Sequence, residues 1–167
     1  MNWDAVAAIA ESVGAVGVIA TLAYVAVQIR SNTKAVRVAT YDSFVQQFRD
    51  WNAPFRTDPE LTTRFVQQLE DIESLDEVSR RHAVHVFHDF FKLAENLHYQ
   101  YRMGMVDQAL WSGWANIYQQ YLTAPGTIWY WEQRRTFFAP EFVEWVDSLQ
   151  ATKPEQPIRS AQIAKLS

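Results

Sequence analysis

The sequence predicts an all-α fold in which one N-terminal transmembrane helix continues into a stalk and is followed by an irregular cytosolic helical bundle. About 25 residues from Ala5 to Ile29 contain a single charged side chain, Glu11, and a helix of that length crosses roughly 30 Å of hydrocarbon. In the rest of the chain, apolar residues recur at helical spacing between Asp, Pro and Gly residues that start or stop helices. No hairpin dipeptide lies between two alternating segments, so strands are not expected.

The composition excludes several classes of protein. Hydrophobic residues make up 49% and charged residues 20% of the 167 residues, which is the balance of a folded chain. The absence of cysteine excludes disulfides, thiol catalysis and cysteine-ligated zinc. A net charge of −4 argues against a nucleic-acid partner. Because no Gly-rich phosphate loop or nucleophile elbow is found, the sequence indicates no cofactor and no catalytic residue, and favours a non-enzymatic role.

Charge supports the membrane assignment of the first helix. Asp4 precedes the apolar stretch, whereas Arg30, Lys34 and Arg37 follow it and would lie at the membrane surface. Basic residues gather on the cytoplasmic side of membrane proteins, so the N-terminus is expected outside and the C-terminal domain in the cytoplasm. A cleaved signal peptide would have basic residues before its apolar segment, and residues 1–4 contain none. The remaining alternative is a core helix that is apolar on all sides.

One narrow face of this helix carries mostly small or polar residues, here called the seam. At spacings of four and three residues it comprises Ala10, Gly14, Gly17, Thr21, Tyr24 and Gln28. Small residues let helix backbones approach closely in lipid, and polar residues form hydrogen bonds across such a contact. The seam therefore predicts self-association. The alternative is chance, because small residues are common in any membrane helix.

Glu11 lies near the outer end of the predicted span and borders the seam. A carboxylate at that position costs less than one at the bilayer centre, so we expect Glu11 at the outer headgroups. In a homo-oligomer, a ring of Glu11 side chains would instead mark the entrance of a cation pore lined by Thr21 and Gln28.

No helix breaker follows Gln28, so the first helix is expected to continue as the stalk until Pro54 stops it. We therefore divide the chain into residues 1–52 as transmembrane helix and stalk, residues 53–150 as cytosolic bundle, and residues 151–167 as a polar C-terminal tail.

The bundle is expected to hold about five helices. Capping Asp or Ser residues and helix-starting prolines predict where they begin: Asp58-Pro59, Ser74 or Asp76, Asp107, Pro125 and Pro140. The longest helix should end at Gly104 and bury one stripe of residues: Ala83, Phe87, Phe90, Ala94, Leu97 and Tyr101. The helix after Asp107 should bury another: Leu110, Trp114, Ile117 and Tyr121. We expect most aromatic rings to fill the core; the alternative is an exposed aromatic patch for a partner.

Two groups of residues have the types and spacings of metal ligands. The longest helix of the bundle carries the first group: His82, His85, His88 and Asp89. They lie opposite its apolar stripe, so a solvated polar face explains them. Glu95 and His98 form one E-x-x-H pair. Di-iron helical bundles need two such pairs and two further glutamates, so a hydrogen-bonded, buried His98 is the preferred interpretation.

Two stretches of the chain resemble those of a known group of proteins. They are AIAESVGAVGVIATLAYVAVQIRSNTKAVR at residues 8–37 and AENLHYQYRMGMVDQALWSGWANIYQQYLTAPGTIWYWEQRRTFFAPEFVEWVD at residues 94–147. Together they resemble an uncharacterised bacterial family of single-span membrane proteins with an N-terminal transmembrane helix and a helical cytosolic domain. The resemblance implies a location in the bacterial inner membrane. Because this family has no assigned activity, it implies no catalytic residues.

The sequence thus predicts a non-enzymatic inner-membrane protein that self-associates or serves as an accessory or scaffold subunit of a membrane complex. Its expected partners are the lipid bilayer and either a second copy of itself or another subunit. Two alternatives stay open: a homo-oligomeric pore with an acidic ring at Glu11, and a metal-dependent helical-bundle enzyme that uses Glu95 and His98.

Overall fold

The computed structural model describes residues 2–152, without the side chains of residues 5, 6, 8–10, 12 and 13. Within this range all regular elements are helices, which confirms the predicted all-α fold class. The elements are α1 (Trp3–Thr57), α2 (Pro59–Glu70), the 3-10 helix η1 (Ile72–Ser74), α3 (Glu77–Arg102), α4 (Gln108–Leu122), α5 (Pro125–Arg134), the 3-10 helix η2 (Arg135–Phe137) and α6 (Pro140–Ala151). The predicted C-terminal tail lies almost entirely outside the described residues.

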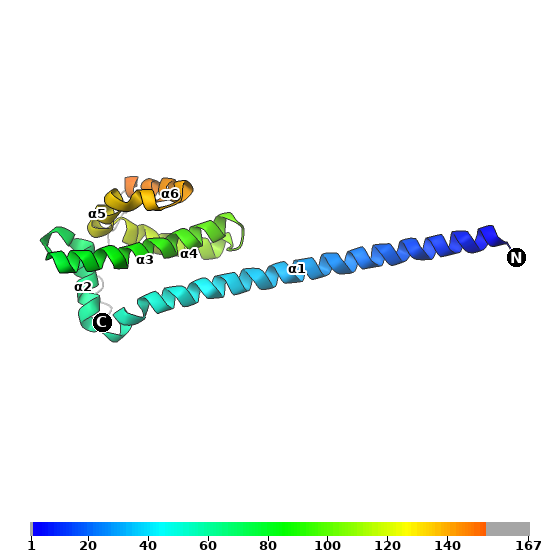
Figure 1. Cartoon of the computed structure of the whole chain (residues 1–167), viewed down its shortest axis with the longest axis horizontal. Coiled ribbons are helices and arrows are strands. Elements are labelled where there is room, and N and C mark those ends of the chain that lie inside the picture. The colour runs from blue at the N-terminus through cyan, green and yellow to red at the C-terminus, as the bar shows by residue number, and fades with distance from the viewer. Residues whose placement is uncertain (1, 153–167) are drawn as a thin grey trace. The chain divides into compact units, whose positions relative to one another are not determined.

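The chain divides into two compact units, Met1–Thr40 and Tyr41–Ser167. The described part of the first unit is almost entirely helix α1, which begins at the blue end of the ribbon (Figure 1). The second unit is a bundle that contains the end of α1 and helices α2 to α6, with α3 and α4 side by side (Figure 1).

The prediction that the first helix continues without a break beyond Gln28 is confirmed, but its predicted stop at Pro54 is wrong by one turn. Helix α1 includes Pro54 and ends at Thr57. A proline nitrogen cannot donate to the carbonyl four residues earlier, yet its own carbonyl still accepts. Here it accepts from the backbone N–H of Asp58 at 3.0 Å, which closes the last turn.

Aspartate caps begin three of the bundle helices, as predicted. The carboxylate of Asp58 accepts from two backbone N–H groups at the start of α2, and Asp107 does the same for Leu110 at 2.9 Å in α4. Of the two candidates for the cap of α3, Asp76 is the cap, and Ser74 belongs to η1. These bonds satisfy N–H groups that have no partner within the helix.

Aromatic rings dominate the core of the bundle. Phe44, Phe87, Phe90, Phe91, Tyr118, Tyr130, Trp131 and Phe142 are each at most 2% exposed. Phe91 stacks on Trp131 with centroids 5.0 Å apart, and Phe44 meets Trp114 edge-on at 4.9 Å. Most of the aromatic residues are therefore structural, as expected.

The predicted stripe of α3 is confirmed, whereas that of α4 is wrong. Ala83, Phe87, Phe90, Ala94 and Leu97 are buried and Tyr101 is half-buried. Helix α4 instead buries Trp111, Tyr118 and Leu122, with Trp114 and Tyr121 half-buried and Leu110 and Ile117 exposed. The large apolar residues of α4 cover an arc of roughly 140°. The predicted stripe lies along one edge of this arc and the buried residues lie along the other, so spacing alone did not select the buried face. Trp111 turns that face inward by stacking on Tyr101 at 4.7 Å.

Polar contacts connect α6 to the preceding helices. The Nε1–H of Trp131 donates to Asp147 at 2.8 Å, and the guanidinium of Arg135 donates to the other oxygen of the same carboxylate at 2.6 Å. The amide of Gln150 donates to the backbone carbonyl of Leu122 at 2.8 Å.

Candidate functional site

The most unusual surface of the described chain is the apolar stretch of α1. Every residue from Gly14 to Ala39 is exposed. The exposed set includes six large apolar side chains that are each 60–67% exposed: Val16, Val18, Ile19, Leu22, Val27 and Ile29. By length and composition, α1 is the one helix in the described residues that could cross a membrane. Being exposed, this stretch does not have the burial expected of a core helix.

The polar residues of the seam already have hydrogen-bond partners within α1. The hydroxyl of Thr21 donates to the carbonyl of Gly17 at 2.9 Å, and the amide of Gln28 donates to the hydroxyl of Tyr24 at 2.6 Å. Such bonds along one helix reduce the cost of placing polar groups in lipid. Gly14 and Gly17 lie open, since a Cβ added at either would meet no other atom within 4 Å. The side chain of Ala10 lies outside the described residues.

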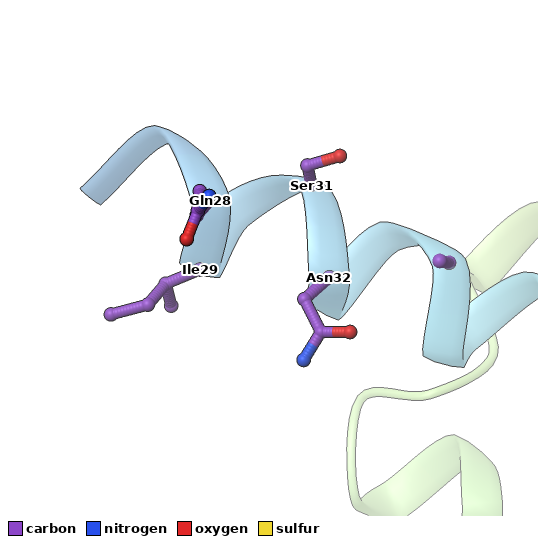
Figure 2. Close-up of a pocket in the computed structure, with 5 residues that line it drawn as sticks. Gln28, Ile29, Ser31 and Asn32 are labelled. Carbon is purple, nitrogen blue, oxygen red and sulfur yellow. The ribbon is translucent and has the colours of Figure 1, made fainter. Parts of the chain in front are cut away.

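The seam continues into a shallow, open surface at its C-terminal end. Gln28, Ile29, Ser31, Asn32 and Ala35 form this surface (Figure 2). In that view, Ser31 points upward and Asn32 points downward from the helix, one turn beyond Gln28. All five residues belong to α1, so no other described element forms part of this surface.

The charged residues of the first unit are exposed. Glu11 is exposed near the start of α1, and its predicted roles stay predictions. Arg30, Lys34 and Arg37 are exposed after the apolar stretch and form no ion pair within the described residues. No acidic residue lies between Glu11 and Asp42 in the sequence.

Within the bundle, an apolar groove lies among α1, α2, α3 and α4. It has a volume of about 450 Å³ and is lined by Phe48, Trp51, Asn52, Phe55, Thr62, Phe65, Val66, Leu69, Phe90, Ile117, Gln120 and Tyr121. The rings of Trp51 and Phe90 lie 5.0 Å apart, and those of Phe55 and Phe65 lie 4.9 Å apart. A mostly apolar hollow of this size with a few amides and hydroxyls is typical of a binding site.

The sequence does not predict this groove. Its wall residues come from four helices, and each residue taken alone is an ordinary core or surface position of its helix. The expected aromatic patch was a general hypothesis without residues. The walls come together only through packing between helices, as where Phe65 lies beside Tyr121 with centroids 6.2 Å apart.

Glu95 and His98 each have structural contacts. One oxygen of Glu95 accepts from the backbone N–H of Ala139 at 2.7 Å, and the other accepts from the ammonium of Lys92 at 2.8 Å. The ring of His98 is 9% exposed and stacks on Trp145 at 5.2 Å. Burial lowers the pKa of His98, and the nearby charge of Arg102 acts in the same direction.

No metal-binding group of three or more His, Asp or Glu side chains is found in the described part of the chain. Glu95 and His98, which form one E-x-x-H pair in the sequence, face different neighbours. The carboxylate joins α3 to the start of α6, and the imidazole belongs to an aromatic cluster with Trp111 and Trp145. Their contacts account for both residues without a ligand role.

The histidines near the start of α3 do not all lie on a solvated face. His82, His85 and Asp89 are exposed, as expected. His88 is half-buried, however, and its Nδ1 forms a hydrogen bond of 2.7 Å with the hydroxyl of Tyr130. Burial raises the pKa of Tyr130 to about 12, so its hydroxyl keeps its proton at neutral pH.

Comparison with models of known protein families, with curated proteins and with solved structures gave no match. The resemblance to the bacterial single-span family therefore stays a prediction.

Proposed function

We propose that the chain is a non-enzymatic, single-span protein of a bacterial inner membrane that self-associates through α1 and serves as an accessory or scaffold subunit of a membrane complex. One observation carries the proposal: the apolar side chains from Gly14 to Ile29 are exposed. Apolar surface of this extent is unfavourable in water and favourable in hydrocarbon. The seam supports the further step of contact between copies.

The proposed orientation places the N-terminus outside and the bundle in the cytoplasm, because Arg30, Lys34 and Arg37 follow the apolar stretch. The absence of cysteine allows a direct test with single-cysteine variants of the full chain. A membrane-impermeant maleimide added to intact spheroplasts should label Asn2→Cys and should not label Ala109→Cys until the membrane is opened. Labelling of Ala109→Cys in intact spheroplasts would refute this orientation.

Self-association is tested by adding bulk to the seam. A side chain at Gly14 or Gly17 meets no atom of the same chain, so Gly14→Leu/Gly17→Leu should leave each copy folded. It should shift the protein toward monomer in native mass spectrometry of complexes released gently from membranes. Ala23→Leu/Ala26→Leu is the matched control, because at about 100° per residue it adds bulk roughly opposite the seam. Equal subunit numbers in both variants would contradict contact through the seam.

The groove of the bundle is the proposed contact site for another subunit. Its half-buried rings, including Trp51 and Phe65, offer the kind of aromatic surface that is enriched at protein interfaces. The same native mass spectra report such a partner as added mass. If it docks in the groove, Gln120→Arg at the rim should release it, whereas Gln133→Arg, exposed elsewhere, should not.

The pore alternative has weaker support. Thr21 and Gln28 would line its path, yet each donates a hydrogen bond within α1. Single-channel recording of purified protein decides this alternative: a conductance that changes with Glu11→Gln would favour the pore over the scaffold.

The metal-enzyme alternative is likewise weaker, since both oxygens of Glu95 accept hydrogen bonds.

A further inference from the structure

The three basic residues that follow the apolar stretch share one face of α1. Arg30, Lys34 and Arg37 are separated by four and three residues, so at about 100° per residue they fall within roughly 60° of one another. Together they form what is called here the cationic face. It lies roughly opposite the seam, which Gln28 and Ala35 continue on the other side of the helix.

The cationic face has no acid to neutralise it within the described residues. Elsewhere, arginine and lysine side chains of the bundle do pair with acids, as Arg64 does with Glu60 at 2.7 Å and Arg135 with Asp147 at 2.6 Å. Along α1, an acid four residues away from a base would form the usual intrahelical pair. The sequence offers none between Glu11 and Asp42, so the face has the charge of a site for anions.

The position of the cationic face along α1 matches that of lipid headgroups. Arg30 directly follows Ile29, the last residue of the apolar stretch. From Arg30 to Arg37 the helix rises roughly 10 Å, and the headgroup layer on one side of a bilayer is roughly 5–7 Å thick. Long basic side chains extend several ångströms along the helix axis, so all three ammonium or guanidinium groups can reach this layer.

We propose that Arg30, Lys34 and Arg37 bind the phosphates of anionic phospholipid headgroups, so that α1 selects anionic lipids around its cytoplasmic end. This inference rests on the proposed membrane location. Because the cationic face lies opposite the seam, two copies in contact through the seam would both turn their basic residues outward to lipid. Selection of lipid and contact between copies would then use different faces of the same helix.

The test is native mass spectrometry of the full chain after reconstitution into vesicles of equal phosphatidylglycerol and phosphatidylcholine. We expect the retained lipid to be enriched in phosphatidylglycerol by on the order of fivefold for each engaged basic residue. Arg30→Gln/Lys34→Gln/Arg37→Gln should bring the ratio of the two lipids close to one. Arg49→Gln/Arg80→Gln/Arg81→Gln, which removes the same charge from the bundle, should leave the enrichment unchanged.

Extraction of the same vesicles with alkaline carbonate separates this inference from the proposed function. Wild type that resists extraction but retains both lipids equally would overturn the lipid selection alone. So would a triple variant that keeps the enrichment of the wild type. Wild type that is removed by carbonate would overturn both the membrane anchor and the lipid selection. Sodium chloride at about 0.5 M should reduce the enrichment, because salt screens exposed charges.

Discussion

Gly126 lies where α5 meets the backbone of α2, and adding one methyl group there should destabilise the bundle strongly. A Cβ at this position would overlap the carbonyl oxygen of Gln68 and would lie 2.9 Å from its carbonyl carbon and 3.2 Å from the Cα of Leu69. These are backbone atoms, so no side chain can rotate away to make room. Gly126→Ala therefore forces the two helices apart in a core where Leu69 and Tyr130 are almost fully buried.

The expected cost is about 3 kcal/mol of unfolding free energy, at the upper end of what overpacking a core usually costs. Gly113→Ala is the matched control, because Gly113 is exposed inside α4 and a Cβ there meets no atom within 4 Å. Alanine is the better helix former by about 0.5–1 kcal/mol, so Gly113→Ala should stabilise the bundle. The same glycine-to-alanine substitution should thus lower the unfolding free energy at Gly126 and raise it at Gly113.

Urea unfolding of the full chain in mild detergent measures both effects. Six of the seven tryptophans belong to residues 51–145, so their fluorescence reports on the bundle. With a slope of roughly 1.5–2 kcal/mol per molar urea, Gly126→Ala should lower the midpoint by roughly 1.5–2 M, and Gly113→Ala should raise it slightly. A midpoint for Gly126→Ala within about 0.3 M of wild type would refute the close approach of α2 and α5.

Two further changes test particular contacts of the bundle. Because the pKa of His98 is lowered in the folded chain, the unfolded chain binds this proton first as the pH falls. The contribution of a neutral, buried His98 to the unfolding free energy is therefore fully present above about pH 6.5, and it is lost as the pH falls from there through the folded-state pKa. His98→Phe should therefore flatten the loss of unfolding free energy between about pH 7 and 5, and a curve parallel to that of wild type would contradict the burial of a neutral imidazole. Trp131→Phe removes the hydrogen bond to Asp147 and part of a buried ring, and should cost about 2–3 kcal/mol in the same urea assay, whereas a loss under about 0.5 kcal/mol would count against this contact.

The helix boundaries could be predicted from the sequence because their causes are local. Asp58, Asp76 and Asp107 cap the helices that follow them, and proline stands at the first position of α5 and α6. The absence of breakers after Gln28 likewise predicted one continuous helix, which α1 is.

Features that depend on packing between helices could not be predicted in the same way. The buried face of α4 follows from Trp111 stacking on Tyr101, since the apolar arc of this helix is wide enough for either of its edges to face the core. The hydrogen bond between His88 and Tyr130 joins residues 42 positions apart. The close approach at Gly126 depends on the backbone of α2, so the sequence around Gly126 indicated only the start of a helix.

The candidate surfaces on a single helix could also be predicted from the sequence, whereas the groove between helices could not. The apolar stretch, the seam and the cationic face belong to one helix, so spacing along the sequence is enough to define them. The groove needs side chains from four helices, of which Phe48 and Ile117 are examples, and only the folded bundle brings them together.

Alkaline carbonate extraction of membranes that contain the full chain tests most directly whether the exposed apolar stretch of α1 lies in lipid. We predict that the wild type stays in the membrane pellet. Ile19→Arg/Leu22→Arg should move into the supernatant, because a charge near the bilayer centre costs about 3 kcal/mol per residue. Recovery of the wild type in the supernatant would contradict the membrane anchor and would leave the apolar surface of α1 to be covered by another protein.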